Sequence, residues 1–161
     1  AEKVILPGVG AAATAMAALR QHDLVDCIRG LTQPVLGVCL GMQLLFEHSA
    51  EGNTPMLGVV AGNCAAFEPE AGLSIPHMGW NQIRSIDKQN RHPLLDGVAE
   101  GSHVYFVHSY FASLSADTIA SCDYGTAFAA IVGSTNFMGC QFHPEKSGPV
   151  GARILQNFLT L

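Results

Sequence analysis

The chain opens as short apolar runs alternating with segments of helical spacing. Residues 3–6 form an apolar run that predicts a strand, and an alanine-rich helix is expected over 11–20. A second helical piece follows from Asp23, and the run 34–38 predicts a further strand. This order is typical of an α/β fold, an open sheet with helices on both faces in which reactive groups gather beyond the carboxyl ends of the strands.

The rest of the chain has the pattern of antiparallel strands. Short β-like pieces over 57–86 alternate with Gly and Pro and predict antiparallel strands added to the parallel layer. The run 103–110 differs little in polarity between its faces, so we expect a strand covered on both sides. Three short strands over 118–142 resemble a meander, and a last helix is expected after Ser147.

A Gly-x-Cys-x-Gly turn lies within the stretch 34–46, which reads as a strand, a sharp turn and a helix. Such an elbow needs Gly37 and Gly41, because strand and helix pass so closely that a Cβ would collide. At the start of a helix, Cys39 is expected to favour the thiolate, with the free amide of Leu40 pointing to the same place. A buried cysteine that packs as a small hydrophobe is the alternative interpretation.

A histidine and a glutamate follow the last strand of the meander. His143 and Glu145 are two residues apart on an extended chain, so both project to one side, and Pro144 between them marks the end of the strand. A carboxylate there can hold the imidazole, which can take the proton of a thiol. Cys39, His143 and Glu145 thus supply nucleophile, base and orienting group, whereas the tripeptide alone would read as a surface pair.

A second oxyanion donor is expected from a loop after a different strand. Pro7-Gly8-Val9-Gly10 is the first candidate, because glycine adopts backbone conformations that let amides face a pocket. A plain strand-to-helix turn is the alternative. For His108 we favour a satisfied interior histidine over a catalytic one, and Trp80 suits either a packed turn or a partner surface.

Composition narrows the class of protein. The 161 residues are 48% hydrophobic and only 13% charged, which suits a sheet buried on both faces or a surface hidden against a partner. The net charge of −5 argues against a nucleic-acid partner, and no apolar run reaches the roughly 18 residues of a membrane span. Five scattered cysteines favour free thiols in a cytoplasmic protein.

Together these motifs resemble the class I glutamine amidotransferases, with a flavodoxin-like sheet as the implied fold. The resemblance rests on 7–10, 37–43 and 141–145, and it covers essentially the whole chain. The stretch 76–81 with 105–110 looks like one branch, the glutaminase subunit of imidazole glycerol phosphate synthase in histidine biosynthesis. Members of the family begin with a further strand and helix before the first strand seen here, so a single glutaminase domain over 1–161, shortened at its N-terminus, is implied.

The resemblance implies hydrolysis of glutamine to glutamate and ammonia. Cys39 would attack the side-chain amide to give a glutamyl thioester, His143 would protonate the ammonia and then activate water, and Glu145 would orient His143. The oxyanion would lie near the amide of Leu40 and the Gly8-Val9 peptide. The residues implied to hold glutamine are Gly10, Gln43, Ser109 and Tyr110.

The resemblance also implies a partner, a (β/α)₈ cyclase subunit that receives the ammonia and makes imidazole glycerol phosphate and an aminoimidazole carboxamide ribotide. Trp80, Tyr105 and Lys146 are the candidates for the docking face of this heterodimer. No cofactor, metal, nucleic acid or membrane is implied. The alternatives are another class I amidotransferase or a γ-glutamyl hydrolase, against which 76–81 weighs, and an inactive fragment that only binds the cyclase partner.

Overall fold

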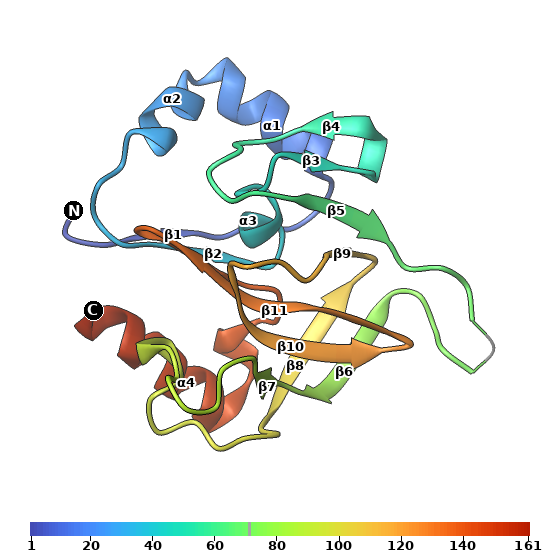
Figure 1. Ribbon diagram of the computed structural model, residues 1–161. Coiled ribbons are helices and arrows are strands. Elements are labelled where there is room, and N and C mark those ends of the chain that lie inside the picture. The colour runs from blue at the N-terminus through green and yellow to red at the C-terminus, as the bar shows by residue number, and fades with distance from the viewer. Residues whose placement is uncertain (71) are drawn as a thin grey trace.

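A six-stranded mixed sheet forms the centre of the fold (Figure 1), and the computed structural model describes residues 1–70 and 72–161. The first three strands in spatial order run parallel, and the remaining pairs are antiparallel. The expected α/β class is confirmed. The strand order is β1 (Val4–Leu6), β2 (Val35–Val38), β12 (Phe137–Cys140), β11 (Thr126–Ser134), β10 (Thr118–Tyr124) and β7 (Arg84–Ser85).

Helices cover both faces of this sheet (Figure 1). On one side lie α1 (Ala12–Gln21), α2 (Leu24–Arg29) and α3 (Leu40–Gln43), and on the other lies α4 (Gly148–Thr160). Successive residues of β2 alternate between two cores, with Val35 packed in the cluster of α1 and α3 and Leu36 in the cluster of α4. Three short 3-10 turns, at Glu51–Asn53, Pro93–Leu95 and Pro144–Lys146, connect these elements.

Two smaller sheets lie beside the central one. The first has the order β4 (Thr54–Pro55), β3 (His48–Ser49), β5 (Asn63–Ala66) and β9 (Tyr110–Ala112), and the second pairs β6 (His77–Gln82) with β8 (His103–His108). Of the pieces expected to extend the parallel layer, only β7 joins the central sheet. That expectation is therefore wrong for β5, which pairs with strands outside the central sheet. The packed turn considered around Trp80 is instead part of β6, which pairs with β8.

The helix after the elbow is shorter than the sequence predicts. It ends at Gln43, whereas helical composition continues to residue 46. The N–H groups of residues 57–60 donate to the carbonyls of residues 44–46, which would otherwise continue the helical ladder. Long-range hydrogen bonds therefore end α3 and turn the chain toward β3.

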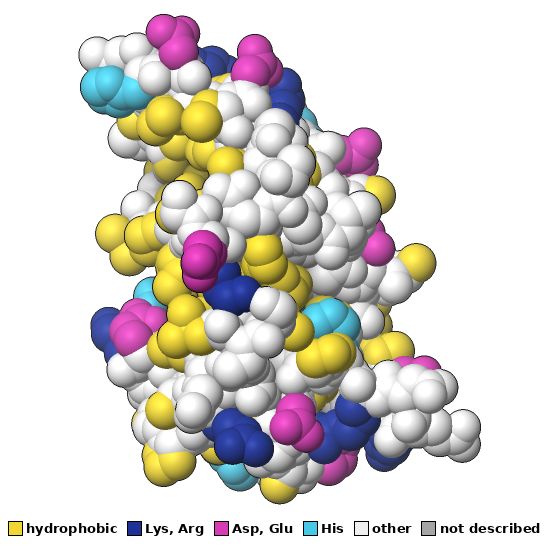
Figure 2. Space-filling model, turned by 90° about the vertical axis from the view of Figure 1, so that its left-hand side faces the viewer, with side chains coloured by type: hydrophobic (Ala, Val, Ile, Leu, Met, Phe, Trp, Pro, Cys, Tyr) yellow, Lys and Arg dark blue, Asp and Glu magenta, His cyan; other side chains and the backbone are white. Residues whose placement is uncertain are grey.

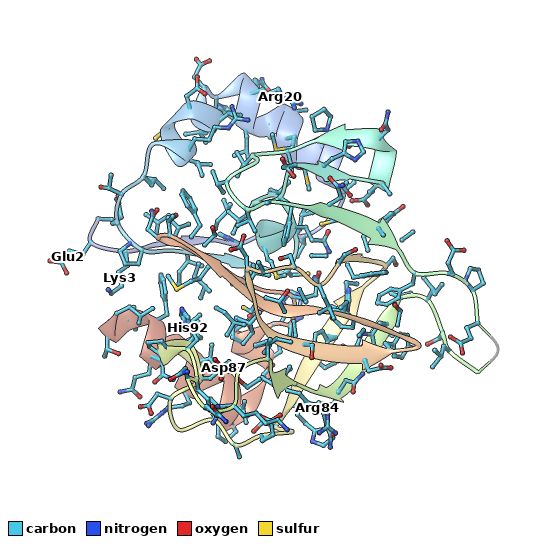
Figure 3. The ribbon with its side chains drawn as sticks, in the orientation of Figure 1. Glu2, Lys3, Arg20, Arg84, Asp87 and His92 are labelled. Atoms are coloured by element: carbon cyan, nitrogen blue, oxygen red, sulfur yellow. The ribbon has the colours of Figure 1, made fainter. Side chains whose placement is uncertain are left out.

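The edge of the sheet at β1 carries exposed apolar side chains. Figure 2 looks onto this side of the molecule and shows hydrophobic side chains gathered across it; Ile5 is 48% and Val9 83% exposed. An apolar pocket of about 350 Å³ at this edge reaches from Ile5 to Leu155. Charged residues lie at the periphery, as the labelled Arg20 and Arg84 show in Figure 3. No helix among residues 1–70 and 72–161 has both the length and the apolar character needed to cross a membrane.

Candidate active site

Cys39 lies at the turn between β2 and α3 in a strained backbone conformation. Its φ of 54° and ψ of −113° fall where residues other than glycine are rare. Its N–H donates to the carbonyl of Cys140 at 2.9 Å, which ties the turn to the end of β12. A Cβ on Gly37 would lie 2.6 Å from the Gly41 carbonyl oxygen, and one on Gly41 would overlap the Leu6 carbonyl. Close backbone approach therefore explains both glycines.

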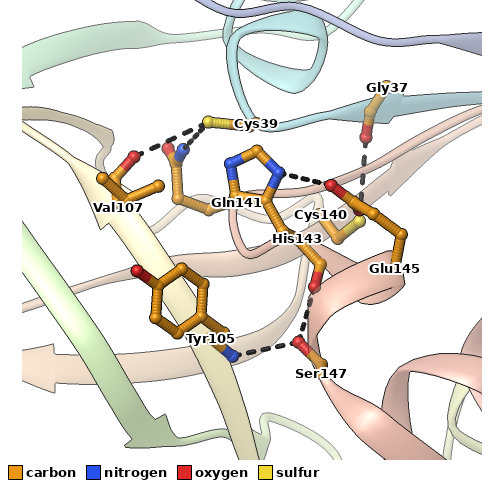
Figure 4. Close-up of polar contacts among 9 residues, drawn as sticks. All are labelled: Gly37, Cys39, Tyr105, Val107, Cys140, Gln141, His143, Glu145 and Ser147. Carbon is orange, nitrogen blue, oxygen red and sulfur yellow. Dashed lines mark hydrogen bonds and ion pairs between the residues drawn. The ribbon is translucent and has the colours of Figure 1, made fainter.

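His143 and Glu145 follow the parallel neighbour of β2, so they lie at the same edge of the sheet as Cys39 (Figure 4). The Nδ1 of His143 lies 2.7 Å from Oε1 of Glu145. Cys39 and His143 line one pocket of about 270 Å³. In Figure 4 the ring nitrogen that Glu145 leaves free is on the side of Cys39. The structure thus brings together the three residues that the sequence pattern selected.

The backbone of His143 is fixed to β8. Its N–H donates to the Tyr105 carbonyl at 2.9 Å, and its own carbonyl accepts from the Ser147 hydroxyl at 2.6 Å. The same hydroxyl accepts from the Tyr105 N–H at 2.9 Å (Figure 4). Ser147, expected only as the start of a helix, therefore also ties the backbone of His143 to β8.

The Cys39 thiol is buried, and its pKa lies above the ordinary value. Burial raises the pKa most, the Leu40 N–H lowers it, and the negative charge of Glu145 raises it further. The thiol donates to the Val107 carbonyl at 3.8 Å and accepts from Nε2 of Gln141 at 3.9 Å. The expectation of a favoured thiolate is wrong for this geometry, because desolvation outweighs the hydrogen-bond donors.

Three of the four expected glutamine-binding residues, Gly10, Gln43 and Tyr110, line the pocket. Ser109 lies outside this lining, and its carbonyl accepts from the Phe67 N–H at 3.1 Å. That bond continues the pairing of β5 with β9, so the Ser109 carbonyl is already engaged in the sheet. The full lining is Val9, Gly10, Cys39, Leu40, Gln43, Glu51, Val107, His108, Tyr110 and His143.

Of the expected oxyanion residues, Leu40 and Val9 line the pocket, whereas Gly8 lies with Val9 in the neighbouring apolar pocket. A Cβ on Gly8 would lie 2.9 Å from the Gly41 nitrogen. The loop after β1 is therefore pressed against the elbow. Gly10 has a φ of 89°, a conformation that favours glycine.

Two residues of the site escaped the sequence reasoning: Gln141, which contacts Cys39 behind the pocket, and Glu51, which lines it. Gln141 is fully buried and contacts Cys39, and its position two residues before His143 on an extended chain is the signal that could have found it. Glu51 begins the 3-10 turn Glu51–Asn53. Its carboxylate accepts from the Ala12 N–H at 2.8 Å, at the start of α1, while the residue lines the pocket.

The three candidate docking residues lie on the exposed side of this region. Trp80 is 57% exposed, and its ring lies 6.1 Å from that of its cross-strand partner Tyr105 at an interplanar angle of 68°. Lys146 is exposed at the end of the turn that follows His143. His108 is both buried, as expected, and part of the pocket lining.

Comparison with known proteins adds independent findings. The family model described as "Glutamine amidotransferase class-I" matches residues 2–161. The chain is 49% identical over 159 residues to "Imidazole glycerol phosphate synthase subunit HisH" of Mannheimia succiniciproducens, covering 99% of this chain and 80% of that protein. It is 53% identical over 171 residues to the protein of the same name in Shewanella loihica, covering 100% and 74%.

Solved structures share the fold at lower identity. The chain aligns with "Crystal structure of glutamine amidotransferase" at a TM-score of 0.68 and 17% identity, covering 99% of this chain and 78% of that chain. The same arrangement of sheet and helices is therefore found in proteins whose sequences have diverged widely.

Proposed function

Because the chain belongs to the class I glutamine amidotransferases and, within them, to the HisH subunits of imidazole glycerol phosphate synthase, we propose that its pocket is the glutaminase site of such a subunit. The reaction is hydrolysis of glutamine to glutamate and ammonia in histidine biosynthesis, carried out by one domain over residues 1–161. One observation carries the assignment of residues: His143, held by Glu145 at 2.7 Å, lines the same pocket as the strained Cys39.

In the first half of the proposed reaction the sulfur of Cys39 attacks the side-chain amide carbon of glutamine. Its proton passes to Nε2 of His143, because Nδ1 is engaged by the carboxylate of Glu145. The carbon–nitrogen bond then breaks, His143 gives the proton to the departing ammonia, and a glutamyl thioester remains. Burial raises the pKa of the resting thiol, so proton transfer accompanies the attack.

In the second half, His143 takes a proton from a water molecule that attacks the thioester carbon. The carbon–sulfur bond breaks, glutamate leaves, and the thiol recovers a proton. Negative charge forms on the carbonyl oxygen in both halves, and the proposed donors are the Leu40 N–H and the Gly8-Val9 peptide. The support is that Leu40 and Val9 line the pocket and that the Leu40 N–H points at the sulfur.

The proposed partner is the (β/α)₈ cyclase subunit, which receives the ammonia and forms imidazole glycerol phosphate and the carboxamide ribotide in a cytoplasmic heterodimer. Trp80, Tyr105 and Lys146 form the proposed docking face. Support comes from continuity: β8 carries Tyr105 and, two and three residues later, the pocket residues Val107 and His108. Five free cysteines agree with a reducing compartment.

The test is glutamate release from glutamine, with and without the cyclase subunit and its nucleotide ligand. We expect release that rises with the liganded partner and vanishes in Cys39→Ala, while Cys39→Ala still binds the partner. Turnover in Cys39→Ala would exclude Cys39 as the nucleophile. Partner binding without any release by the unaltered chain would instead favour a fragment that only binds.

A further inference from the structure

Two buried imidazoles lie end to end behind the pocket. His77 and His108 are cross-strand partners in β6 and β8, 3% and 6% exposed, and Nδ1 of His77 lies 2.9 Å from Nε2 of His108. The ring of His77 is stacked between Tyr124 and Phe106, at centroid distances of 3.9 and 4.9 Å. Burial lowers the pKa of His77 to about 4 and that of His108 to about 3, so both rings are neutral near pH 7.

The Tyr110 carbonyl determines which nitrogen of each ring carries the hydrogen. Nδ1 of His108 lies 2.8 Å from this oxygen, and a carbonyl only accepts, so Nδ1 carries the hydrogen. Nε2 of the neutral ring is then an acceptor, and Nδ1 of His77 must donate to it. Nε2 of His77 is left to accept from Nδ2 of Asn81, at 3.2 Å.

The Asn81 end of this series of hydrogen bonds independently gives the same donors and acceptors. Nδ2 of Asn81 also donates to the Asp123 carbonyl at 2.9 Å, and Oδ1 of Asn81 accepts from the Gln82 N–H at 2.7 Å. A reversed carboxamide would place oxygen against oxygen and N–H against N–H. Both ends therefore require the Nδ1–H tautomer in both histidines.

Beyond the Tyr110 carbonyl the hydrogen bonds continue to the nucleophile. Nε2 of Gln43 donates to this carbonyl at 2.8 Å and to Oε1 of Gln141 at 2.9 Å, which uses both of its hydrogens. Nε2 of Gln141 is then the group that donates to the sulfur of Cys39, at 3.9 Å. The Tyr110 carbonyl thus receives one hydrogen from His108 and one from Gln43, and it sets the direction of both side chains.

The orientation of Gln43 has a chemical consequence for the pocket. Since its amide hydrogens face Tyr110 and Gln141, its oxygen remains for the pocket that Gln43 lines. Among the described residues, every fully buried side-chain nitrogen or oxygen has a hydrogen-bond partner. The Oε1 of Gln43, which is left without such a partner, is therefore not fully buried and can be reached from the pocket. Such an oxygen accepts from an N–H donor, as in an ammonium or amide group of a substrate.

We propose that His77 and His108 are positioning residues of this site, which hold the Tyr110 carbonyl so that Gln43 presents its oxygen to the substrate and Gln141 its N–H to Cys39. Their role toward glutamine rests on the proposed function, whereas the tautomers follow from the hydrogen bonds alone. Neither histidine acts on the reacting atoms in this arrangement.

The first test is nitrogen NMR of the unaltered chain, labelled with ¹⁵N-histidine, at pH 7. We expect the Nδ1–H tautomer for His77 and His108, which is the less populated form of free neutral imidazole in water. His92 serves as the internal reference, because its Nδ1 accepts from the Leu94 N–H at 3.2 Å and the opposite tautomer is required. An Nε2–H tautomer at either His77 or His108 would overturn the proposal, and this measurement needs no variant to fold.

The second test separates positioning from packing with two substitutions of one residue. The amide nitrogen of Asn replaces Nδ1 of histidine and that of Gln replaces Nε2, so His108→Asn keeps the donor to Tyr110 and His108→Gln loses it. Measured with the cyclase partner, His108→Gln should raise KM for glutamine about five- to tenfold, the effect of one hydrogen bond. His108→Asn keeps the donor to Tyr110 but loses the acceptor for Nδ1 of His77, so it should raise KM less than His108→Gln does.

The control is His92→Asn, which replaces a capping histidine beside the C-terminal part of α4 (Figure 3) and should leave KM unchanged. An equal rise of KM in both His108 variants would overturn the positioning role, since both disturb the same packing. If the unaltered chain with its partner releases no glutamate, the proposed function fails and with it the role toward glutamine. The NMR result then still decides the tautomers separately.

Discussion

Nδ1 of His143 faces Oε1 of Glu145 at 2.7 Å across the single residue Pro144. The imidazole side chain is 7% exposed, whereas the carboxylate side chain is 53% exposed. The carboxylate thus reaches the ring from the solvent side and selects Nδ1–H, which leaves Nε2 as the base. Removing this carboxylate should therefore leave the imidazole in place but no longer fix its tautomer and orientation.

The two residues should therefore differ in the size of their effect. Glu145→Gln should lower kcat for glutamine about 100-fold, whereas His143→Asn should lower it about 10⁴-fold. Glutamate release with the cyclase partner measures both, and Glu2→Gln at the exposed N-terminus is the control (Figure 3). Activity of Glu145→Gln within twofold of the unaltered chain would contradict the orienting role.

The resting Cys39 thiol should react slowly with an alkylating agent. Burial raises its pKa above the ordinary value of about 9, so the thiolate fraction, and with it the rate of labelling by iodoacetamide, should still rise beyond pH 9. The exposed Cys27 is the internal reference, and the buried Cys140 should remain unlabelled. Peptide mass spectrometry resolves the three sites. Faster labelling of Cys39 than of Cys27 at pH 7.5 would show that the thiolate already exists.

Gly41→Ala should unfold or strongly destabilise the chain, because the new Cβ would overlap the Leu6 carbonyl, a backbone atom that cannot move alone. We expect a loss of at least about 3 kcal/mol in the free energy of unfolding, measured by urea denaturation. Gly30→Ala is the matched control, since its φ of −83° suits alanine and its nearest neighbour, the Asp26 carbonyl oxygen at 3.2 Å, needs to move by only a few tenths of an ångström. Similar losses in the two variants would refute the close-approach explanation.

Stability should fall as the pH drops from about 6.5 to 4. The pKa of His77 is lowered to about 4 and that of His108 to about 3 by burial, so over this range the unfolded chain binds more protons than the folded one. Each histidine contributes a slope of about 1.4 kcal/mol per pH unit. His92, whose pKa burial also lowers, adds in the same direction. Urea denaturation at pH 7 and pH 5 measures the difference.

The matching variant for this pH dependence is His108→Gln, which removes one of the titrating groups and should reduce the slope. A free energy of unfolding that is the same at pH 7 and pH 5 would contradict the burial of neutral rings. A slope unchanged by His108→Gln would show that His108 is not among the groups responsible.

Trp80→Ala should weaken association with the cyclase subunit about tenfold to a hundredfold in Kd, because large aromatic side chains dominate interface energetics. Calorimetric titration of the two subunits measures this. Leu159→Ala is the control, since Leu159 is 61% exposed but lies near the end of α4, away from β6 (Figure 1). An unchanged Kd and unchanged stimulation of glutamate release would remove Trp80 from the docking face.

The elbow and the His143–Glu145 pair could be predicted because local geometry determines both. Two glycines around a cysteine fix a tight turn, and alternation along an extended chain fixes which side chains share a side. The length of α3 could not be predicted in this way, since residues 57–60 supply the hydrogen bonds that end it.

The contacts around Gln43 and His108 depend on strand register. Gln43 meets Gln141 across 98 residues, and His77 meets His108 across 31, so no local pattern reveals either pair. Register also explains why Ser109 lies outside the pocket lining, since its carbonyl belongs to the pairing of β5 with β9. The sequence could propose which residues are reactive, but the hydrogen bonds that orient them required the pairing of distant strands.

The bond from the Cys39 N–H to the Cys140 carbonyl has a consequence for the order of assembly. A ribosome makes the elbow about a hundred residues before its β12 neighbour, so the cysteine at first lacks the strand that closes the turn and the histidine that serves as its base. Folding that depends on such distant contacts is slow, and Cys39 reaches its final environment only when β12 pairs with β2. Catalytic competence therefore depends on β12 and the turn after it, which carries the base, having docked beside the elbow.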